Sequence, residues 1–297
     1  MAWIWITLAA AAAQTLRFMV QKRLRLGTLS SAGATYARFV YAGPLIVAFA
    51  LVYAQVQGGF PDRMPMFWVY ATIGGISQIL ATVCLVSLFA MRHFSVGITL
   101  SKTEVIMTAG LGFVILGDAL TGTALLAMMI GVVAVIVLSQ TSGMRLTWAT
   151  VVNRATVLGV SSGLLFGMSS TMYRGASQQV LAEDVLLRSS QTLMFVILIQ
   201  SVLMTVYLLW FEKGQITSVF RAWRTAAWVG LLSVIGSLGW FTAFAMQKAA
   251  YVKALGQVEV IFSLIIAALV FKEKLSLREG IGIALMTVSI LALVLAA

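Results

Sequence analysis

The feature that most constrains this chain is a series of apolar runs, each about 20 residues long and bounded by charge, proline or glycine. A membrane-spanning helix needs about 20 predominantly apolar residues, so each run is long enough to cross a bilayer. The ten runs cover approximately residues 2–20, 31–54, 66–90, 95–116, 121–140, 155–177, 185–210, 225–246, 251–271 and 278–296. We therefore predict an all-α polytopic membrane protein with ten transmembrane helices.

Composition supports a membrane protein and excludes a soluble one. The chain is 61% hydrophobic and only 10% charged, with a mean hydropathy of +1.01. In a soluble protein, a net charge of +11 would suggest binding to nucleic acid. In this chain it reflects basic cytoplasmic loops and contact with anionic lipid. We expect membrane lipid and no nucleic acid as a partner. A transmembrane β-barrel is rejected because stretches such as 282–297 are apolar on every side.

An internal repeat predicts how the helices are arranged. Residues 89–138 align without a gap onto 244–293, and ten of the fifty aligned pairs are identical. The identities include the Glu-Val-Ile runs that begin at Glu104 and Glu259. With five helices on each side, an odd number, the two halves must insert with opposite orientations, which is the inverted-repeat architecture of secondary transporters.

The repeat also predicts the domain organisation and the orientation. We expect one integral membrane domain, with a first five-helix repeat at 1–150 and a second at 151–297. Connections after odd-numbered runs carry twelve Lys and Arg residues, whereas those after even-numbered runs carry three. Because cytoplasmic loops are enriched in Lys and Arg, the count predicts a multi-pass protein of the cytoplasmic membrane whose two termini face away from the cytoplasm.

The pattern resembles the EamA-type family of the drug/metabolite transporter superfamily. Each half has a basic residue early in its second helix and an acidic residue after its fourth, within the sequences Gly117-Asp118-Ala119-Leu120 and Lys272-Glu273-Lys274-Leu275. The resemblance covers essentially the whole chain. It implies a ten-helix inner-membrane carrier for small metabolites, often amino acids, with a central cavity. It also implies cytoplasmic termini, opposite to the orientation that the charge count predicts.

Charged residues within the apolar runs are the main functional candidates, because a charge at the bilayer centre costs about 2.5–3.5 kcal/mol or more. Glu104 and Glu259 lie near the middle of their runs, where a short side chain cannot reach water. We predict that both bind substrate or protons. The alternative is a buried structural pair, satisfied by Lys102, Lys253, an arginine or hydroxyl groups. Lys102 is two residues from Glu104 on the same helix, so any ion pair that it forms should be with another helix.

Small and polar residues flank each glutamate at helical spacing and predict a cavity on one helix face. The two stripes are Gly97, Ser101, Glu104, Thr108 and Gly112, and Val252, Gly256, Glu259, Ser263 and Ala267. We predict that Lys102, Arg38, Arg188 and Lys253 meet anionic groups of the substrate. For Arg17, Arg38 and Arg188, each within two turns of a helix end, the alternative is a side chain that snorkels to the interface.

Further cavity candidates come from the third and eighth runs. Gln78 and Thr82 align with Ser233 and Ser237, and Trp240 follows one turn later. Gln78 and Trp240 are expected to contact substrate, with packing as the alternative for Trp240. Because the chain has one cysteine, Cys84, and one histidine, His93, we expect no metal site, no cofactor and no catalytic residue.

These observations predict a secondary active transporter that moves a small polar, amino-acid-like metabolite by alternating access. The opposite charges favour a zwitterionic or anionic substrate, and protons are a candidate coupling ion. Two alternatives stay open: an organic-anion exchanger without proton coupling, and a polytopic membrane enzyme or lipid-handling protein. The sequence Gly159-Val160-Ser161-Ser162-Gly163 fits the nucleophile motif G-x-S-x-G, but it lies in mid-helix, where that motif has no catalytic context.

Overall fold

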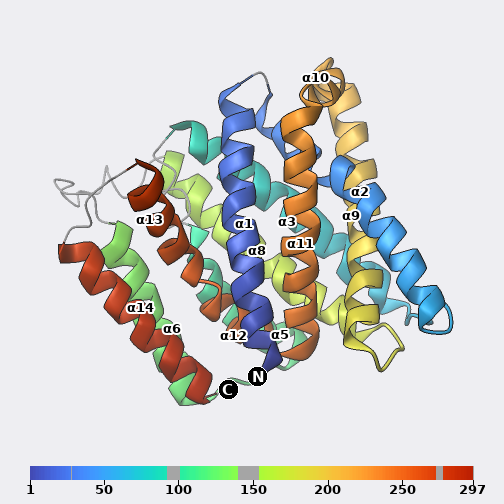
Figure 1. Ribbon diagram of the computed structural model, residues 1–297. Helices are drawn as coiled ribbons and strands as arrows, with labels where there is room; N and C mark the ends of the chain where they lie inside the picture. The colour runs from blue at the N-terminus through green and yellow to red at the C-terminus, as the bar shows by residue number, and fades with distance from the viewer. Residues whose placement is uncertain (28, 92–100, 140–153, 272–276, 297) are drawn as a thin grey trace.

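The computed structural model describes residues 1–27, 29–91, 101–139, 154–271 and 277–296, and these fold into a helical bundle (Figure 1). In the described ranges no strand forms beyond one isolated bridge between Arg63 and Val180. The helices are α1 (Ala2–Leu26), α2 (Ser31–Val56), α3 (Met66–Met91), α5 (Glu104–Leu116), α6 (Gly122–Ser139), α8 (Arg154–Gln178), α9 (Val185–Phe211), α10 (Gln215–Arg221), α11 (Trp223–Met246), α12 (Ala249–Leu255), α13 (Val258–Phe271) and α14 (Leu277–Ala296).

Five of these helices are long and apolar enough to cross a membrane: α1, α2, α3, α9 and α11. Three shorter apolar stretches lie in α5, α6 and α14. Large apolar side chains are exposed on the outer surfaces of the bundle, such as Val202 at 62% and Leu126 at 63%. Exposure on that scale suits a surface in contact with lipid rather than water. The predicted class, an integral multi-pass helical membrane protein, is confirmed.

Helix ends follow local sequence signals. Ser30 caps α2 by accepting a hydrogen bond from the backbone N–H of Gly33, and Asp184 caps α9 by accepting one from Leu187. Gly117 ends α5 with φ at +68°, a left-handed conformation that glycine adopts without a steric penalty. These caps fix where the connections begin and end, and so which side chains lie at the ends of the bundle.

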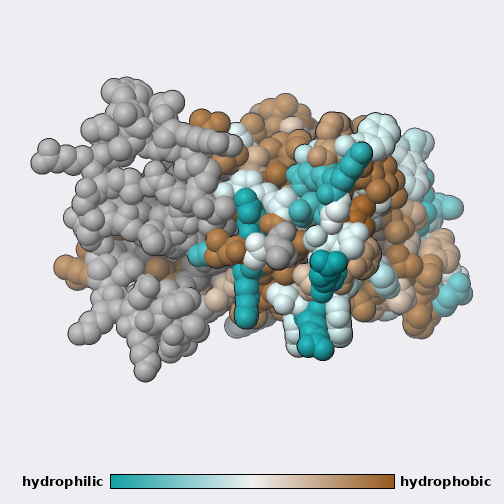
Figure 2. All heavy atoms as spheres, turned by 90° about the horizontal axis from the view of Figure 1, so that it is seen from above, coloured by the Kyte–Doolittle hydropathy of each residue, from teal (hydrophilic) through white to brown (hydrophobic). Residues whose placement is uncertain are grey.

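The two chain termini lie at the same end of the bundle (Figure 1). The last turn of α1 and the short helix α10 lie at the opposite end, which Figure 2 shows from above with hydrophilic side chains gathered on it. This opposite end carries basic residues of the connections after the first and seventh apolar runs: Lys22, Arg23, Arg25, Lys213, Arg221 and Arg224. The separation of basic side chains from the termini agrees with the charge count, and the membrane orientation itself stays a prediction.

Long helix pairs form the core. α3 packs along α8, α1 along α11, and α6 along α14, while α2 lies against α9 and α11. Close approach between α5 and α8 depends on glycine: a Cβ on Gly167 would lie 3.0 Å from the Met107 Cβ and 3.0 Å from the Thr108 nitrogen. Gly163 and Gly167 on α8 therefore serve close helix packing.

Candidate functional site

Two turns, each next to the start of a helix, position the charged residues. A turn at residues 102–103 precedes α5, and a turn at 256–257 separates α12 from α13. In the sequence repeat the two turns are offset by one residue, since 102–103 aligns with 257–258. Glu104 directly follows the first turn, and Glu259 comes two residues after the second. The backbone N–H of Glu259 bonds to the carbonyl of Gly256 at 3.1 Å, and that of Val105 bonds to Lys102 at 3.3 Å. Such three-residue spacing tightens the chain locally, and it places both carboxylates at the N-terminal, electropositive ends of helices.

The two glutamates and two lysines form one buried ionic network. Lys102 Nζ lies 2.5 Å from Glu259 Oε2 and 3.6 Å from Glu104 Oε1, and Lys253 Nζ lies 3.3 Å from Glu104 Oε2. Each of the four residues is at most 7% exposed. Lys102 pairs with another helix, as predicted. It also approaches Glu104, which the sequence analysis excluded; that exclusion was wrong because the turn at 102–103 breaks the helical geometry on which it relied.

Helix α1 extends this network. The Gln14 amide donates a hydrogen bond to Glu259 Oε1, and its carbonyl oxygen accepts one from Arg17 at 3.4 Å. Arg17 also donates to Gln21 at 2.6 Å and is 2% exposed. Gln14 therefore links Arg17 to the glutamate. Arg17 does not snorkel, because its guanidinium is turned into the bundle.

Arg38 on α2 is the second buried arginine, and it is 4% exposed. Its guanidinium donates only to hydroxyl oxygens: Nε to Ser233 at 2.9 Å, Nη2 to Ser237 at 3.1 Å and Nη1 to Thr82 at 3.4 Å. The sequence repeat had grouped these three hydroxyl residues. Arg38 reaches them across the centre of the bundle, so the snorkelling alternative is wrong for this residue too.

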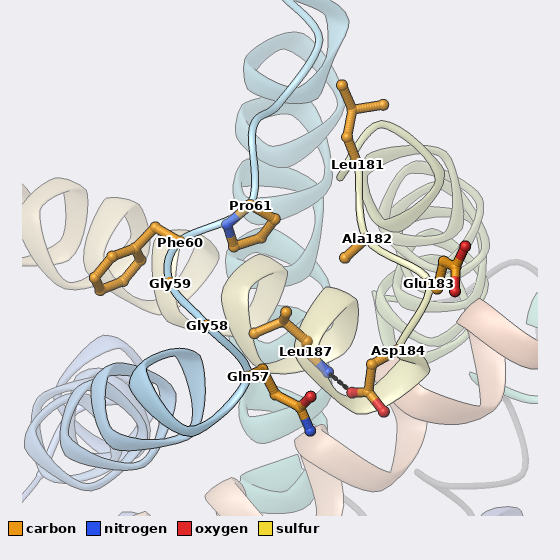
Figure 3. Close-up of a pocket in the computed structure, with 10 residues that line it drawn as sticks. All are labelled: Gln57, Gly58, Gly59, Phe60, Pro61, Leu181, Ala182, Glu183, Asp184 and Leu187. Carbon is orange, nitrogen blue, oxygen red and sulfur yellow. Dashed lines mark hydrogen bonds between the residues drawn. The ribbon is translucent and has the colours of Figure 1, made fainter.

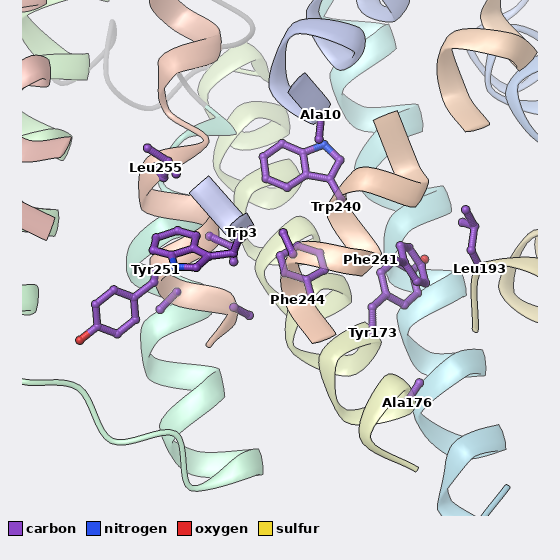
Figure 4. Packing of buried hydrophobic residues seen from close by; sticks show 14 of the residues in the cluster. Trp3, Ala10, Tyr173, Ala176, Leu193, Trp240, Phe241, Phe244, Tyr251 and Leu255 are labelled. Carbon is purple, nitrogen blue, oxygen red and sulfur yellow. The ribbon is translucent and has the colours of Figure 1, made fainter. Parts of the chain in front are cut away.

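Aromatic side chains line the space beside Lys253. Its ammonium lies 4.8 Å from the ring centroid of Trp240, and 5.8 Å from those of Phe166 and Phe244. Cations and aromatic faces attract one another at these distances. Figure 4 shows Trp240, Phe241 and Phe244 on α11 beside Tyr173 of α8. The indole nitrogen of Trp240 is buried and has no hydrogen-bond partner among the described residues.

Gln78 belongs to a polar cluster on the same side of the bundle. Its side-chain oxygen accepts hydrogen bonds from Tyr173 at 3.1 Å and from Gln200 at 3.0 Å. Gln200 and Tyr173 are at most 1% exposed, and the Tyr173 ring packs against Phe241 with centroids 4.4 Å apart. Gln78 therefore connects α3, α8 and α9 beneath the aromatic residues.

Two small cavities lie at this centre. The first, about 20 Å³, is lined among others by Gln14, Arg38, Gln78, Ser237, Trp240 and Lys253. The second, about 10 Å³, is lined among others by Lys102, Glu104, Lys253 and Glu259. A volume on this scale holds about one water molecule, so the structure is closed around the site. Admission of a larger molecule requires helices to separate.

A larger hollow of about 610 Å³ lies near one end of the bundle, between the connection at 57–61 and residues 181–187 (Figure 3). Its carboxylates are Glu183 and Asp184, and the latter is occupied in capping α9 through the backbone N–H of Leu187. The buried cations and carboxylates of the centre do not line it. The size of the hollow therefore does not make it the better candidate site.

Another ion pair fastens the turn after α5. Arg174 Nε lies 2.8 Å from Asp118 Oδ2, and Arg174 Nη1 donates to the carbonyls of Phe244 and Gln247, each at 2.8 Å. Lys248 adds a bond to the Ala119 carbonyl at 2.5 Å. The turn at 117–120, which carried the family resemblance, is thus held by residues of the second half. Its repeat equivalent at 272–275 lies outside the described residues.

The structure brings together most of the candidates that the sequence singled out. Lys102, Glu104, Lys253 and Glu259 meet directly, while Arg38, Gln78 and Trp240 line the adjoining cavity. Arg188 lies in the first turn of α9 and lines neither central cavity. In the stripes of small residues, Gly97 and the side chains of Ser263 and Ala267 fall outside the described part, as does His93.

Sequence reasoning missed Gln14, Phe166, Tyr173 and Gln200. Gln14 had one available signal, since it is a polar residue within an alanine-rich apolar run. The aromatic residues gave no such signal, because an apolar residue in a sequence is equally compatible with a position that faces lipid, core or cavity. Among the described residues no group of three or more His, Cys, Asp or Glu side chains is arranged to hold a metal ion.

Comparisons with known proteins agree with this architecture. A solved structure described only as "Crystal structure of protein" superposes with a TM-score of 0.69, covering 97% of this chain and 99% of that chain at 13% identity, so the likeness concerns the fold. No curated protein sequence matches this chain. Residues 154–295 match the EamA-like transporter family. That match confirms the resemblance seen in the sequence: this part of the chain belongs to the EamA-like transporter family, within the drug/metabolite transporter superfamily.

Proposed function

We propose that the protein is a secondary active transporter that moves a small polar metabolite, zwitterionic or anionic, across the cytoplasmic membrane by alternating access. The observation that carries this proposal is the buried network of Lys102, Glu104, Lys253 and Glu259, which lies at the turns before α5 and α13 beside a closed cavity. Buried ionisable groups at broken helices, near the middle of a membrane bundle, are typical of substrate and ion sites in transporters.

Helix packing supports a ten-span inverted repeat. If a two-fold axis relates two five-helix halves, a contact between the first helix of one half and the third helix of the other must occur twice. The pairs α1 with α11 and α3 with α8 are two such contacts, while α2 packs against its counterpart α9 and α6 against α14. In this proposal α12 and α13 are one interrupted span, equivalent to the span that ends with α5.

Alternating access requires contacts that can open at each end. At the end with the termini, the backbone of Met64 bonds to Gln179 at 3.0 Å and that of Leu181 bonds to Asp62 at 2.8 Å. At the opposite end, Ser30 bonds through its hydroxyl to Glu212 and through its backbone N–H to Gln215 at 2.9 Å. Both sets of contacts join the first half of the chain to the second, and each involves few residues. The contacts at one end can therefore break while those at the other end stay formed.

The coupling ion follows from the role of the two glutamates. In a proton-coupled carrier, Glu104 or Glu259 exchanges its proton during the cycle, and the paired lysine then changes partner. In an exchanger without proton coupling, the glutamates stay paired and only neutralise Lys102 and Lys253. The short distances within the network favour the exchanger without proton coupling. The exchanger and the proton-coupled carrier predict different responses to pH.

The experiment is charge movement recorded from proteoliposomes on a solid-supported membrane, with amino acids, organic acids and amines at two pH values. Wild type is compared with Glu104→Gln and Glu259→Gln, and with Glu183→Gln as the control, because Glu183 is exposed in a connection. A substrate-evoked current that changes with pH and is lost in either core variant supports proton-coupled transport. A pH-independent current supports the exchanger. Lipid turnover without any flux would overturn the transporter assignment.

A further inference from the structure

The buried polar centre carries more positive than negative charge. Arg17, Arg38, Lys102 and Lys253 supply four cations, against the two carboxylates of Glu104 and Glu259. Arg17 is connected to Glu259 through Gln14, and the lysines are in direct contact with the glutamates. Arg38 forms no salt bridge with any described carboxylate. A buried charge without a counter-charge is costly, so the centre is incomplete without an anion.

Arg38 has donors to spare where an anion could bind. A guanidinium carries five N–H donors, and Arg38 uses three of them, all on hydroxyl oxygens. Ser233 and Ser237 accept these bonds and donate none to described residues, so their own protons are available to an incoming acceptor. Ser237 and Arg38 both line the central cavity. Guanidinium and hydroxyl donors that converge on one space suit a carboxylate.

Five aromatic side chains also line this cavity, together with the polar residues Gln14, Gln78, Ser169, Ser170 and Lys253. Phe166, Tyr173, Trp240, Phe241 and Phe244 line it together with Arg38. Trp240 and Phe244 stack with centroids 6.0 Å apart. Flat apolar walls next to a cationic end favour a ligand with an aromatic or apolar body and one anionic group.

The carboxylates of the centre are already engaged. Glu259 contacts Lys102 and accepts a hydrogen bond from Gln14, while Glu104 lies within 3.6 Å of Lys102 and 3.3 Å of Lys253. Neither lines the cavity that contains Arg38. A substrate ammonium would therefore meet Arg38 and Lys253, two cations, without a free carboxylate to pair with.

We propose that the transported substrate is a net organic anion, an aromatic or apolar carboxylic acid whose carboxylate binds Arg38 and Ser237 while its body packs against Trp240. This inference rests on the proposed function and narrows it, since it excludes amines and places zwitterions below anions. In the empty, closed conformation the serine and threonine hydroxyls satisfy part of the guanidinium, and substrate binding supplies the missing negative charge.

The test uses three probes that share one aromatic body and differ in charge: 3-phenylpropionate, L-phenylalanine and phenethylamine. Equilibrium binding of each is measured on purified full-length protein in nanodiscs. We expect 3-phenylpropionate to bind most tightly, L-phenylalanine at least tenfold more weakly and phenethylamine not measurably. Arg38→Gln should weaken anion binding at least tenfold, because hydrogen bonds to a charged group are lost. Arg38→Lys should retain part of the affinity, and Ser237→Ala should weaken it severalfold.

Arg63→Gln is the control, because Arg63 bonds to Gln191 near one end of the bundle and does not line the central cavity. Thermal unfolding of each variant shows whether it is folded. If Arg38→Gln does not fold, Ser237→Ala still tests the inference.

Equal or tighter binding of the zwitterion or the amine would overturn the inference. So would no binding of the anion, or an unchanged affinity for it in folded Arg38→Gln. Flux is measured separately: anion binding without flux contradicts the transporter proposal alone, and flux of an amine contradicts the anion inference alone.

Discussion

The ammonium of Lys102 lies 2.5 Å from the carboxylate of Glu259, and it joins the turn before α5 to the first turn of α13. The two residues are 4% and 1% exposed. Attraction between opposite charges is strong at this distance because little water screens it, yet both groups had to lose their hydration to reach it. The pair therefore depends on each partner to compensate the other.

Removing one partner should be more damaging than removing both. We expect Glu259→Gln to lower the free energy of unfolding by about 3–5 kcal/mol, because it leaves the Lys102 ammonium buried without its nearest carboxylate. The double variant Lys102→Met with Glu259→Gln should recover part of this loss. Thermal unfolding of the four proteins of this double-mutant cycle in detergent measures the coupling. Additive effects would show that the pair does not act as a unit.

Gly256 should not tolerate a side chain, because Trp240 packs directly against it. A Cβ at this position would collide with the Cη2 atom of Trp240, although the backbone there is helical, with φ at −61°. We expect Gly256→Ala to destabilise the protein by about 1–3 kcal/mol through overpacking, as measured by thermal unfolding.

Gly110→Ala is the matched control for that substitution. No atom lies within 4 Å of a Cβ at Gly110, so alanine there should be neutral or stabilise the helix by up to about 1 kcal/mol. Trp240→Leu should relieve the cost of Gly256→Ala when the two are combined. Similar effects of alanine at Gly110 and Gly256 would contradict the packing argument.

Arg174 should control the order of the turn at 117–120. It binds Asp118 and two carbonyls of the α11 end simultaneously. We expect Arg174→Gln to speed amide hydrogen exchange at 118–121 at least tenfold, because each lost bond to the charged guanidinium is worth about 1.5–3 kcal/mol. Exchange in α9 should not change. Uniform acceleration throughout the protein would instead indicate global destabilisation.

The membrane orientation can be read by labelling. The only cysteine is Cys84, so Cys84→Ser provides a background without thiols. In this background we expect a membrane-impermeant maleimide to label Ala2→Cys in intact cells, and Lys213→Cys only after permeabilisation. The reason is that the basic connections stay in the cytoplasm. The reverse labelling pattern would place the termini inside, as the family resemblance implies.

Much of the fold could be predicted because bilayer physics leaves few choices. An apolar run of about 20 residues must satisfy its own backbone hydrogen bonds in lipid, so it becomes a helix, and the starts of α2, α3 and α9 agree with the predicted runs at 31, 66 and 185. The repeat singled out both glutamates, and the cost of burying a charge singled out Lys102 and Lys253. The sequence assigned these lysines to the substrate and named them as partners of the glutamates only in the structural alternative. These conclusions depend on local composition and spacing, which a sequence displays directly.

Tertiary structure decided what composition cannot express. The turns at 102–103 and 256–257 interrupt runs that look continuously helical, and they bring Lys102 within reach of both glutamates. The burial of Arg17 and Arg38, and the separate position of Arg188, depend on which face of each helix meets its neighbours. Apolar residues are compatible with lipid, core or cavity alike, so only packing could place Phe166 and Tyr173 beside Arg38. The sequence thus determined which buried charged groups need a partner within the membrane. The fold determined which of these groups have one.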